Sequence, residues 1–267
     1  MRDRASGAGP NQRGPWQGAQ AIRRALMILR MLAAGREKGV PLAEVVRSAG
    51  LTRPTAHRII QVLIEEGIVE RNAKSGGYAI GQQVPELALA RQSRSPLLAA
   101  AEPFLTDASR QLGDTLFLTV RTGLDALCVA RRIGAYPVQI LSIEVGARRP
   151  LGVSSAGVAI LAAMSSHEAR KIVLANQVRF AAYRTNASTI LNQIAAARRK
   201  GYGLRDIGLV PGTKSMSAWI RGPDGDPAAA ITISAIRSRL NPRRESEVAE
   251  ILVKAASSIE AAISFLQ

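Results

Sequence analysis

The chain has 267 residues, enough for two medium-sized domains, and 47% of them are hydrophobic, which excludes wholesale disorder. Its 36 lysines and arginines against 20 acidic residues give a formal net charge of +16, which favours a polyanionic partner such as nucleic acid or an anionic membrane surface. No run predicts a transmembrane helix, and one cysteine with two histidines excludes an internal disulfide and a Cys/His zinc cluster.

The first elements are a polar arm and a helix. Residues 1–18 are rich in Gly, Pro and Arg and lack an apolar run, which predicts a flexible basic arm. Apolar residues then recur at helical spacing through residues 20–34, so we expect a helix there. Its apolar stripe consists of Ile22, Leu26, Leu29 and Ala33.

A helix-turn-helix pattern follows. A short helix is predicted over residues 41–49, and Gly50 closes it. Thr52 is a plausible N-cap for a third helix from Arg53 to about Glu66, in which Pro54 is tolerated because it lies in the first turn.

Two short β-like runs, residues 68–71 and 77–80, come next and are joined by a turn-rich stretch. They read as a hairpin, the wing that often follows a helix-turn-helix. We therefore predict a winged helix-turn-helix domain over residues 19–81.

The third helix carries the candidate DNA contacts. A major groove admits one α-helix, and side chains near the N-terminal half of that helix read base edges. Arginines there can pair with guanine or phosphate, and threonines can donate to phosphate. Solvated charges on a small helical bundle are the alternative interpretation. The predicted DNA-binding residues are Thr52, Arg53, Thr55, His57, Arg58 and Gln61 in the helix, with Arg71 and Lys74 in the wing.

The rest of the chain has a different pattern of predicted helices and strands. Residues 82–96 are predicted to form a linker, with a helix over 84–94, and helical character continues to residue 112 with breaks near Pro96 and Pro103. Residues 97–267 mix strands and helices, which predicts an α+β domain with an antiparallel sheet. Strands are expected at 115–121, 126–133, 137–145, 214–221 and 228–236, and helices at 154–164, 168–176, 187–200 and 244–266.

The order and spacing of these segments resemble the IclR family of bacterial transcription regulators, and the resemblance covers nearly the whole chain. The motifs that carry it are residues 21–33, 41–71, 77–81, 103–120, 148–164, 200–212 and 224–240. The resemblance implies a winged helix-turn-helix, a linker helix and a GAF-like effector-binding domain. It also implies palindromic operators bound by a homodimer or dimer of dimers, in which the first helix and linker help to pair the DNA-binding domains.

Matching the family's pocket motifs onto this chain implies an effector site. Its hydroxyl groups and the start of the helix near Ser154 are suited to a carboxylate, although the same residues could simply cap helices or lie in strands. The implied effector-binding residues are Leu141, Ser155, Ala156, Arg205, Ser215, Thr232 and Ser234.

Three positions depart from the family pattern. Arg205 stands where the family often has an acidic residue, Ser215 where a cysteine is frequent, and Val158 where a lysine is common. The effectors of better-known relatives therefore cannot be transferred to this chain. Our hypothesis is that Arg205, and with it Arg149, favours an anionic effector, the alternative being a solvated Arg205.

These observations predict a cytoplasmic, sequence-specific transcription regulator that binds double-stranded operator DNA and a small anionic metabolite, with no cofactor and no membrane partner. A nonspecific architectural DNA-binding protein is the first alternative, because the net charge alone would explain it. An enzyme domain fused to a DNA-binding module is the second, and the scarcity of histidine and cysteine disfavours it.

Overall fold

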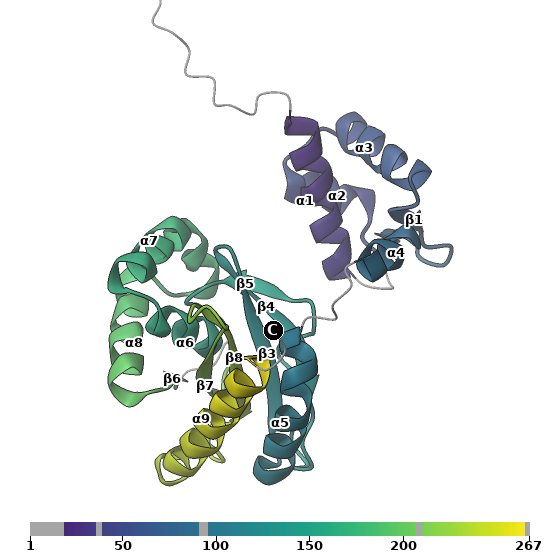
Figure 1. Ribbon diagram of the computed structural model, residues 1–267. Helices are drawn as coiled ribbons and strands as arrows, with labels where there is room; N and C mark the ends of the chain where they lie inside the picture. Colours follow the sequence, from purple (N-terminus) through teal and green to yellow (C-terminus); the bar gives the residue numbers. More distant parts are fainter. Residues whose placement is uncertain (1–18, 36–38, 91–95, 207–209, 265–267) are drawn as a thin grey trace, which may run out of the picture. The chain divides into compact units, whose positions relative to one another are not determined.

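The computed structural model describes residues 19–35, 39–90, 96–206 and 210–264 (Figure 1). The chain divides into two compact units, Met1–Gln92 and Ser93–Gln267, each with its own apolar core. The predicted arm, residues 1–18, lies outside the described residues, as does the end of the predicted linker helix. The predicted domain boundaries stay predictions.

The first unit is a helix-turn-helix followed by a two-stranded antiparallel hairpin, which confirms the predicted winged helix-turn-helix. Val40 pairs with Tyr78 through two backbone hydrogen bonds and so ties the hairpin to the segment before the second helix. Its elements are α1 (Gln20–Gly35), α2 (Leu42–Ala49), α3 (Arg53–Glu65), β1 (Val69–Arg71), β2 (Tyr78–Ile80) and α4 (Gln83–Ala90).

The buried face of α1 differs from the predicted stripe. Ile28 and Leu32 are fully buried, whereas Ile22 and Leu26 are 63% and 46% exposed. Apolar residues form two neighbouring rows on this helix, and the sequence pattern does not indicate which row packs against α2 and α3. In the structure, the row that contains Ile28 and Leu32 packs into the core of the first unit.

The second unit is an α+β domain, which confirms the predicted fold class. Its helices are α5 (Pro96–Leu112), α6 (Ser155–Ala163), α7 (Ser166–Asn176), the 3₁₀-helix η2 (Gln177–Tyr183), α8 (Ala187–Lys200) and α9 (Pro242–Ser264). Its strands are β3 (Thr115–Thr122), β4 (Asp125–Arg132), β5 (Arg148–Pro150), β6 (Gly203–Arg205), β7 (Thr213–Arg221) and β8 (Pro227–Ile236).

The six strands form one antiparallel sheet in the order β5-β4-β3-β8-β7-β6, and helices cover it on both sides (Figure 1). Because side chains alternate across a strand, each strand contributes to two cores. Leu118, Met216 and Ile231 join α5 and α9, whereas Ala126 and Ala230 join α6 and α8. No helix among the described residues is both long enough and apolar enough to cross a membrane.

Two sequence-based expectations are wrong in this unit. Residues 137–145 are irregular rather than a strand, and the Gln139 amide there donates to three backbone carbonyls in place of a strand ladder. The edge of the sheet that this segment would extend is taken by β5, which pairs with β4. Helix α5 also runs through Pro103 without a break, since Pro103 is exposed while the neighbouring Ala101 and Leu105 are fully buried.

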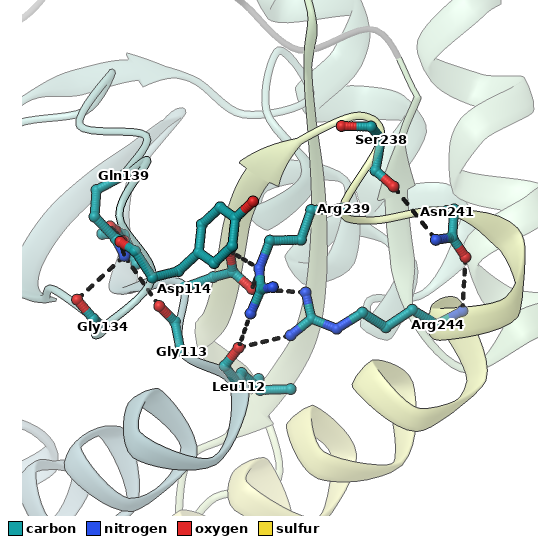
Figure 2. Close-up of polar contacts among 11 residues, drawn as sticks. Leu112, Gly113, Asp114, Gly134, Gln139, Ser238, Arg239, Asn241 and Arg244 are labelled. Atoms are coloured by element: carbon teal, nitrogen blue, oxygen red, sulfur yellow. Dashed lines mark hydrogen bonds and ion pairs between the residues drawn. The ribbon is translucent and has the colours of Figure 1, made fainter.

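A buried carboxylate joins the two helices that cover one face of the sheet. Asp114, 1% exposed, accepts hydrogen bonds from Arg239 at 2.7 Å and from Arg244 at 2.7 Å (Figure 2). Both guanidinium groups also donate to the carbonyl of Leu112, the last residue of α5. Arg239 further stacks over the ring of Tyr136, 3.8 Å from its centroid. This cluster fixes the end of α5 against the start of α9.

Candidate functional site

The turn between α2 and α3 is set by a left-handed glycine. Gly50 ends α2 with a φ of 61°, a conformation that strains any residue with a Cβ, and its N–H donates to the Val46 carbonyl. Thr52 then has extended backbone at the start of α3, and Pro54 lies in the first turn, where its missing N–H breaks no helical bond. These local preferences build the helix-turn-helix.

Helix α3 has one inward and one outward face. Ala56 and Ile60 are fully buried in the core of the first unit. Pro54, Arg58 and Gln61 follow at helical spacing on the opposite face, and Pro54 and Arg58 are exposed. An arginine therefore stands near the middle of the outward face, in the N-terminal half of the helix, as a DNA-reading helix requires.

Of the six residues predicted here, Thr52 is the N-cap of α3, Arg53, Thr55, His57 and Arg58 lie in its first half, and Gln61 lies about one turn further on. Thr52, Arg53, His57 and Arg58 are exposed, whereas Thr55 and Gln61 are partly buried. The hydroxyls of Thr52 and Thr55 are hydrogen-bonded at 2.9 Å, and Gln61 Nε2 lies 3.4 Å from His57 Nε2. The surface thus offers two guanidinium groups among hydroxyl, amide and imidazole groups, which can bond both phosphates and base edges.

The two wing residues have different surroundings. Arg71 uses its Nε to donate to the Gly76 carbonyl at 3.3 Å, which braces the hairpin turn. The Asn72 side chain accepts from the backbone N–H groups of Lys74 and Ser75, so the turn is built by its own residues. Lys74 is exposed at this turn. The turn geometry therefore presents Lys74 outward and partly engages Arg71.

In the second unit, hydroxyl groups line the face of the sheet that α6 covers. Ser155, at the start of α6, bonds Ser215 at 2.9 Å and Ser217 at 2.8 Å. Ser217 in turn lies 2.8 Å from the Thr232 hydroxyl, so four hydroxyls form a continuous chain. Because one hydroxyl can both donate and accept, such a chain satisfies buried oxygens without any charge.

Helix α6 and strand β6 approach one another closely at this chain. Ser154 caps α6 by accepting from the Gly157 N–H at 3.2 Å. A Cβ on Gly203 would lie 2.7 Å from the Ser155 carbonyl oxygen, so only glycine allows β6 to pack here. The close packing brings Arg205, two residues along β6, to the same site.

A cavity of about 20 Å³ lies between the start of α6 and the sheet. Its lining includes six of the seven predicted effector residues: Ser155, Ala156, Arg205, Ser215, Thr232 and Ser234. The seventh, Leu141, is 46% exposed and is not part of the lining, and its neighbours Ser142 and Ile143 line the cavity instead. Since a space of this size holds one water molecule, an organic acid requires the walls to part.

Two arginines stand beside this cavity. Burial lowers the pKa of Arg205, and the positive charge of Arg149 lowers it further. Burial also lowers the pKa of Arg149, whose Nη2 donates to the Ser142 carbonyl at 3.0 Å. Two like charges held near one another and partly out of water favour an anion between them.

Sequence reasoning missed several residues of these surfaces. Ser217 is the fully buried centre of the hydroxyl chain, and its spacing two residues after Ser215 on a strand could have indicated it. Val62, 51% exposed on α3 and one turn after Arg58, is suited to the methyl group of a thymine. The other missed lining residues are Phe117, Thr119, Ser142, Ile143 and Thr213, whereas Ser154 lies where the start of a helix was predicted to face the effector.

Family models match the chain over both units. Residues 21–73 match the IclR helix-turn-helix domain, and residues 90–261 match the bacterial transcriptional regulator IclR C-terminal domain. The two matches follow one another along the chain and together cover most of it.

Curated relatives match over nearly the same length. The chain is 26% identical over 243 residues to the transcriptional repressor IclR of Escherichia coli (strain K12), covering 90% of this chain and 88% of that protein. It is 27% identical over 250 residues to the HTH-type transcriptional repressor AllR of the same strain, covering 92% and 91%. These relatives are transcription regulators, not enzymes.

Solved structures share the fold. A putative IclR transcriptional regulator from Silicibacter sp. TM1040 superposes with a TM-score of 0.78 at 25% identity, covering 91% of this chain and 96% of that one. An IclR homologue from Microbacterium hydrocarbonoxydans, complexed with 4-hydroxybenzoate, gives a TM-score of 0.70 at 24% identity, covering 91% and 99%.

Proposed function

This chain belongs to the IclR family of bacterial transcriptional regulators, and we propose that it binds a specific operator and responds there to a small organic anion. The observation that supports this best is the pair of half-buried arginines, Arg149 and Arg205, beside a cavity lined with hydroxyl groups. Both E. coli relatives described above are named repressors, so repression is the proposed direction of control.

The proposed DNA contacts lie on α3 and the wing. Arg58 and Gln61 lie opposite the buried face of the helix and enter the major groove, where arginine suits guanine and glutamine suits adenine. Thr52, Arg53, Thr55 and His57 surround the helix N-terminus, where backbone N–H groups favour phosphate. Lys74 and Arg71 contact the neighbouring backbone from the wing.

The proposed effector contacts surround the small cavity. The anion lies against Arg205 and Arg149, and the hydroxyls of Ser155, Ser215 and Thr232 bind its remaining oxygens. The M. hydrocarbonoxydans protein, solved with 4-hydroxybenzoate, makes an organic-acid ligand compatible with this architecture. Because the cavity offers only about 20 Å³, entry of the acid moves its walls, and that movement is the signal we propose.

A homodimer or dimer of dimers is proposed as the DNA-binding form. Ile22 and Leu26 on α1 and Leu87 on α4 are all large apolar side chains that are at least 46% exposed. Exposed apolar side chains on one DNA-binding unit are suited to packing against a second copy. Two copies related by a two-fold axis would read a palindromic operator.

The test is a gel-shift titration with the DNA upstream of the protein's own gene, against competitor DNA, with and without a panel of organic acids. Preference for the upstream DNA and its loss with one acid are expected. Equal affinity for random DNA would instead identify a nonspecific architectural protein, the alternative that the charge of +16 suggests.

Replacing Arg149 and Arg205 separately by Met should abolish the acid's effect while leaving DNA affinity unchanged, because neither residue belongs to the DNA-binding unit. The matched control is Arg170→Met, which removes one exposed charge on α7. An acid effect that survives both substitutions would contradict the proposed effector site.

A further inference from the structure

A second, larger hollow opens beside the small cavity. It has a volume of about 1030 Å³ and lies among η2, α8, β5 and β6, and Arg205 lines both spaces. We call it the outer groove. A short acid would fill little of it, since pockets of this size enclose drug-sized ligands.

The lining of the outer groove is strongly cationic. Arg149, Arg184, Lys200 and Arg205 line it, and the acidic residue in its lining is Asp206. That carboxylate is already paired, because Lys214 Nζ lies 2.9 Å from its Oδ1. The lining thus carries four cationic side chains and one carboxylate, and a ligand with two negative charges compensates this positive excess better than one with a single charge.

Three buried polar atoms in this lining lack a hydrogen-bond partner within the described part of the chain. They are Arg149 Nη1, Thr185 Oγ1 and Gln193 Oε1. A buried polar atom without a partner destabilises the fold, so its presence calls for an explanation. A ligand that parts the lining and carries hydroxyl groups supplies the missing partners for both Thr185 and Gln193.

The backbone at the rim of the groove is also strained. Arg184 has a φ of 53°, and within the described ranges no other residue except glycine has a positive φ. Such conformations are uncommon outside glycine and cluster at functional sites. This one directs a charged residue to line the groove directly beside Thr185.

From these observations we propose that the outer groove binds a hydroxylated organic dianion. One negative charge lies between Arg149 and Arg205, the hydroxyl groups meet Thr185 and Gln193, and further negative charge lies at Arg184 and Lys200. The proposal rests on the proposed function, since the charge held between Arg149 and Arg205 is that of the proposed effector, and it names the chemical class to which that effector belongs. A dicarboxylate and a phosphate monoester share this chemistry.

Four acids with six-carbon chains separate charge from hydroxylation in calorimetric titrations of the full-length protein. Glucarate has two charges and hydroxyls, gluconate one charge and hydroxyls, adipate two charges only, and hexanoate one charge only. We expect glucarate to bind at least tenfold more tightly than each of the others, as one or two lost bonds imply. Glucose 6-phosphate tests whether both charges belong on one group. If neither it nor glucarate binds more tightly than adipate and gluconate, the proposal is wrong.

A double variant tests the hydroxyl contacts. Thr185→Val with Gln193→Met removes both of the buried oxygens that lack a partner among the described residues, together with Gln193 Nε2, so the free energy of unfolding should stay the same or rise. Affinity for the tighter dianion should fall about tenfold, while affinity for adipate stays unchanged. The matched control, Thr122→Val with Gln177→Met, changes exposed residues outside the lining. Equal losses for both ligands would overturn the assignment of hydroxyl contacts.

Gel shifts with the same ligands separate this proposal from the proposed function. A hydroxylated dianion that binds but leaves operator affinity unchanged would support the ligand class and contradict effector control. Pyruvate that alters operator affinity, when no hydroxylated dianion binds, would support effector control and overturn the ligand class.

Discussion

The two units treat their polar residues in opposite ways. On α3, Arg53, His57 and Arg58 are exposed and stand on a helix whose other face forms the core. In the second unit, Ser155 and Ser217 are at most 1% exposed and bond one another inside the protein. The polar groups on α3 are exposed to water, and a bound partner would replace that water. The buried hydroxyls of the second unit are hydrogen-bonded to one another instead of to water.

This difference has a consequence for mutagenesis. Removing an exposed side chain from α3 changes DNA affinity without changing the core, because surface substitutions seldom alter stability by more than about 0.5 kcal/mol. Removing a buried hydroxyl or carboxylate from the second unit leaves its partners unpaired and lowers stability as well as binding. Stability and binding are therefore expected to separate in one unit and to change together in the other.

The largest expected effect is at Asp114. Asp114→Ala leaves Arg239 and Arg244 without their carboxylate and should lower the free energy of unfolding of the second unit by about 3–5 kcal/mol. Trp219 lies in the second unit, so its fluorescence in a Trp16→Phe background follows the loss during urea denaturation.

Asp107→Ala is the matched control for that change. Asp107 pairs with Arg110 on the surface of α5, and their side chains are 48% and 82% exposed, respectively. Exposed pairs of this kind contribute about 0–1 kcal/mol. Similar losses for the two variants would show that the Asp114 cluster does not hold α5 and α9 together.

The next effect concerns DNA alone. Arg58→Met should weaken operator binding by about 1–3 kcal/mol and relax sequence preference at one base pair, while the free energy of unfolding stays the same. Fluorescence anisotropy with labelled upstream DNA measures the first and urea denaturation the second. Arg170→Met is again the charge-matched control. A uniform loss across all sequences, with a salt dependence reduced by about one phosphate, would mark Arg58 as a backbone contact instead.

Elements with a local cause were predictable from the sequence. Gly50 and Pro54 mark the turn and the start of α3, and the hairpin follows from its turn residues. The strand predicted over residues 137–145 was wrong, because nothing in the local sequence shows that β5 pairs with the edge of β4 or that Gln139 donates to three carbonyls. The helix break predicted near Pro103 was wrong, because the core packing of the neighbouring residues offsets the free-energy cost of a proline inside the helix.

The candidate site was predictable only in part, and by resemblance more than by physics. Motif matching pointed to Ser155, Ser215 and Arg205, which lie around one cavity. Ser217 was not predicted, because a serine in a strand gives no sign of its partners in the sequence. Only the sheet register places it between Ser155 of α6 and Thr232 of β8. Thr185 and Gln193 escaped because an unsatisfied polar atom is visible only in three dimensions.

A smaller effect is expected within the hydroxyl chain. Ser217→Ala removes the link between Ser155 and Thr232 and should lower the free energy of unfolding by about 1–2 kcal/mol, because both neighbours lose a buried bond. Urea denaturation followed by Trp219 fluorescence measures it. Ser238→Ala, in the exposed turn after β8, is the control and should have almost no effect. An unchanged free energy of unfolding for Ser217→Ala would mean that the chain of hydroxyl groups contributes nothing to stability. Its side chains would then be free to turn towards a ligand.

The smallest effect separates two residues that begin helices. Ser165 caps α7 by accepting from the Glu168 N–H at 3.2 Å, so Ser165→Ala should lower stability by about 1 kcal/mol. Thr52 stands at the same position of α3 but makes no such bond, and its hydroxyl is bonded to Thr55 instead.

Thr52→Ala should therefore change the free energy of unfolding by only a few tenths of a kcal/mol, as at an exposed site. It should still weaken operator binding by about 0.5–1.5 kcal/mol, since a hydroxyl beside the N-terminus of α3 can donate to phosphate. Thermal unfolding by circular dichroism and anisotropy on the same samples test both statements. If Thr52→Ala instead matches the stability loss of Ser165→Ala with full DNA affinity, then Thr52 is a structural cap, and the contrast between groups proposed to contact DNA and groups bonded within the protein fails at this residue.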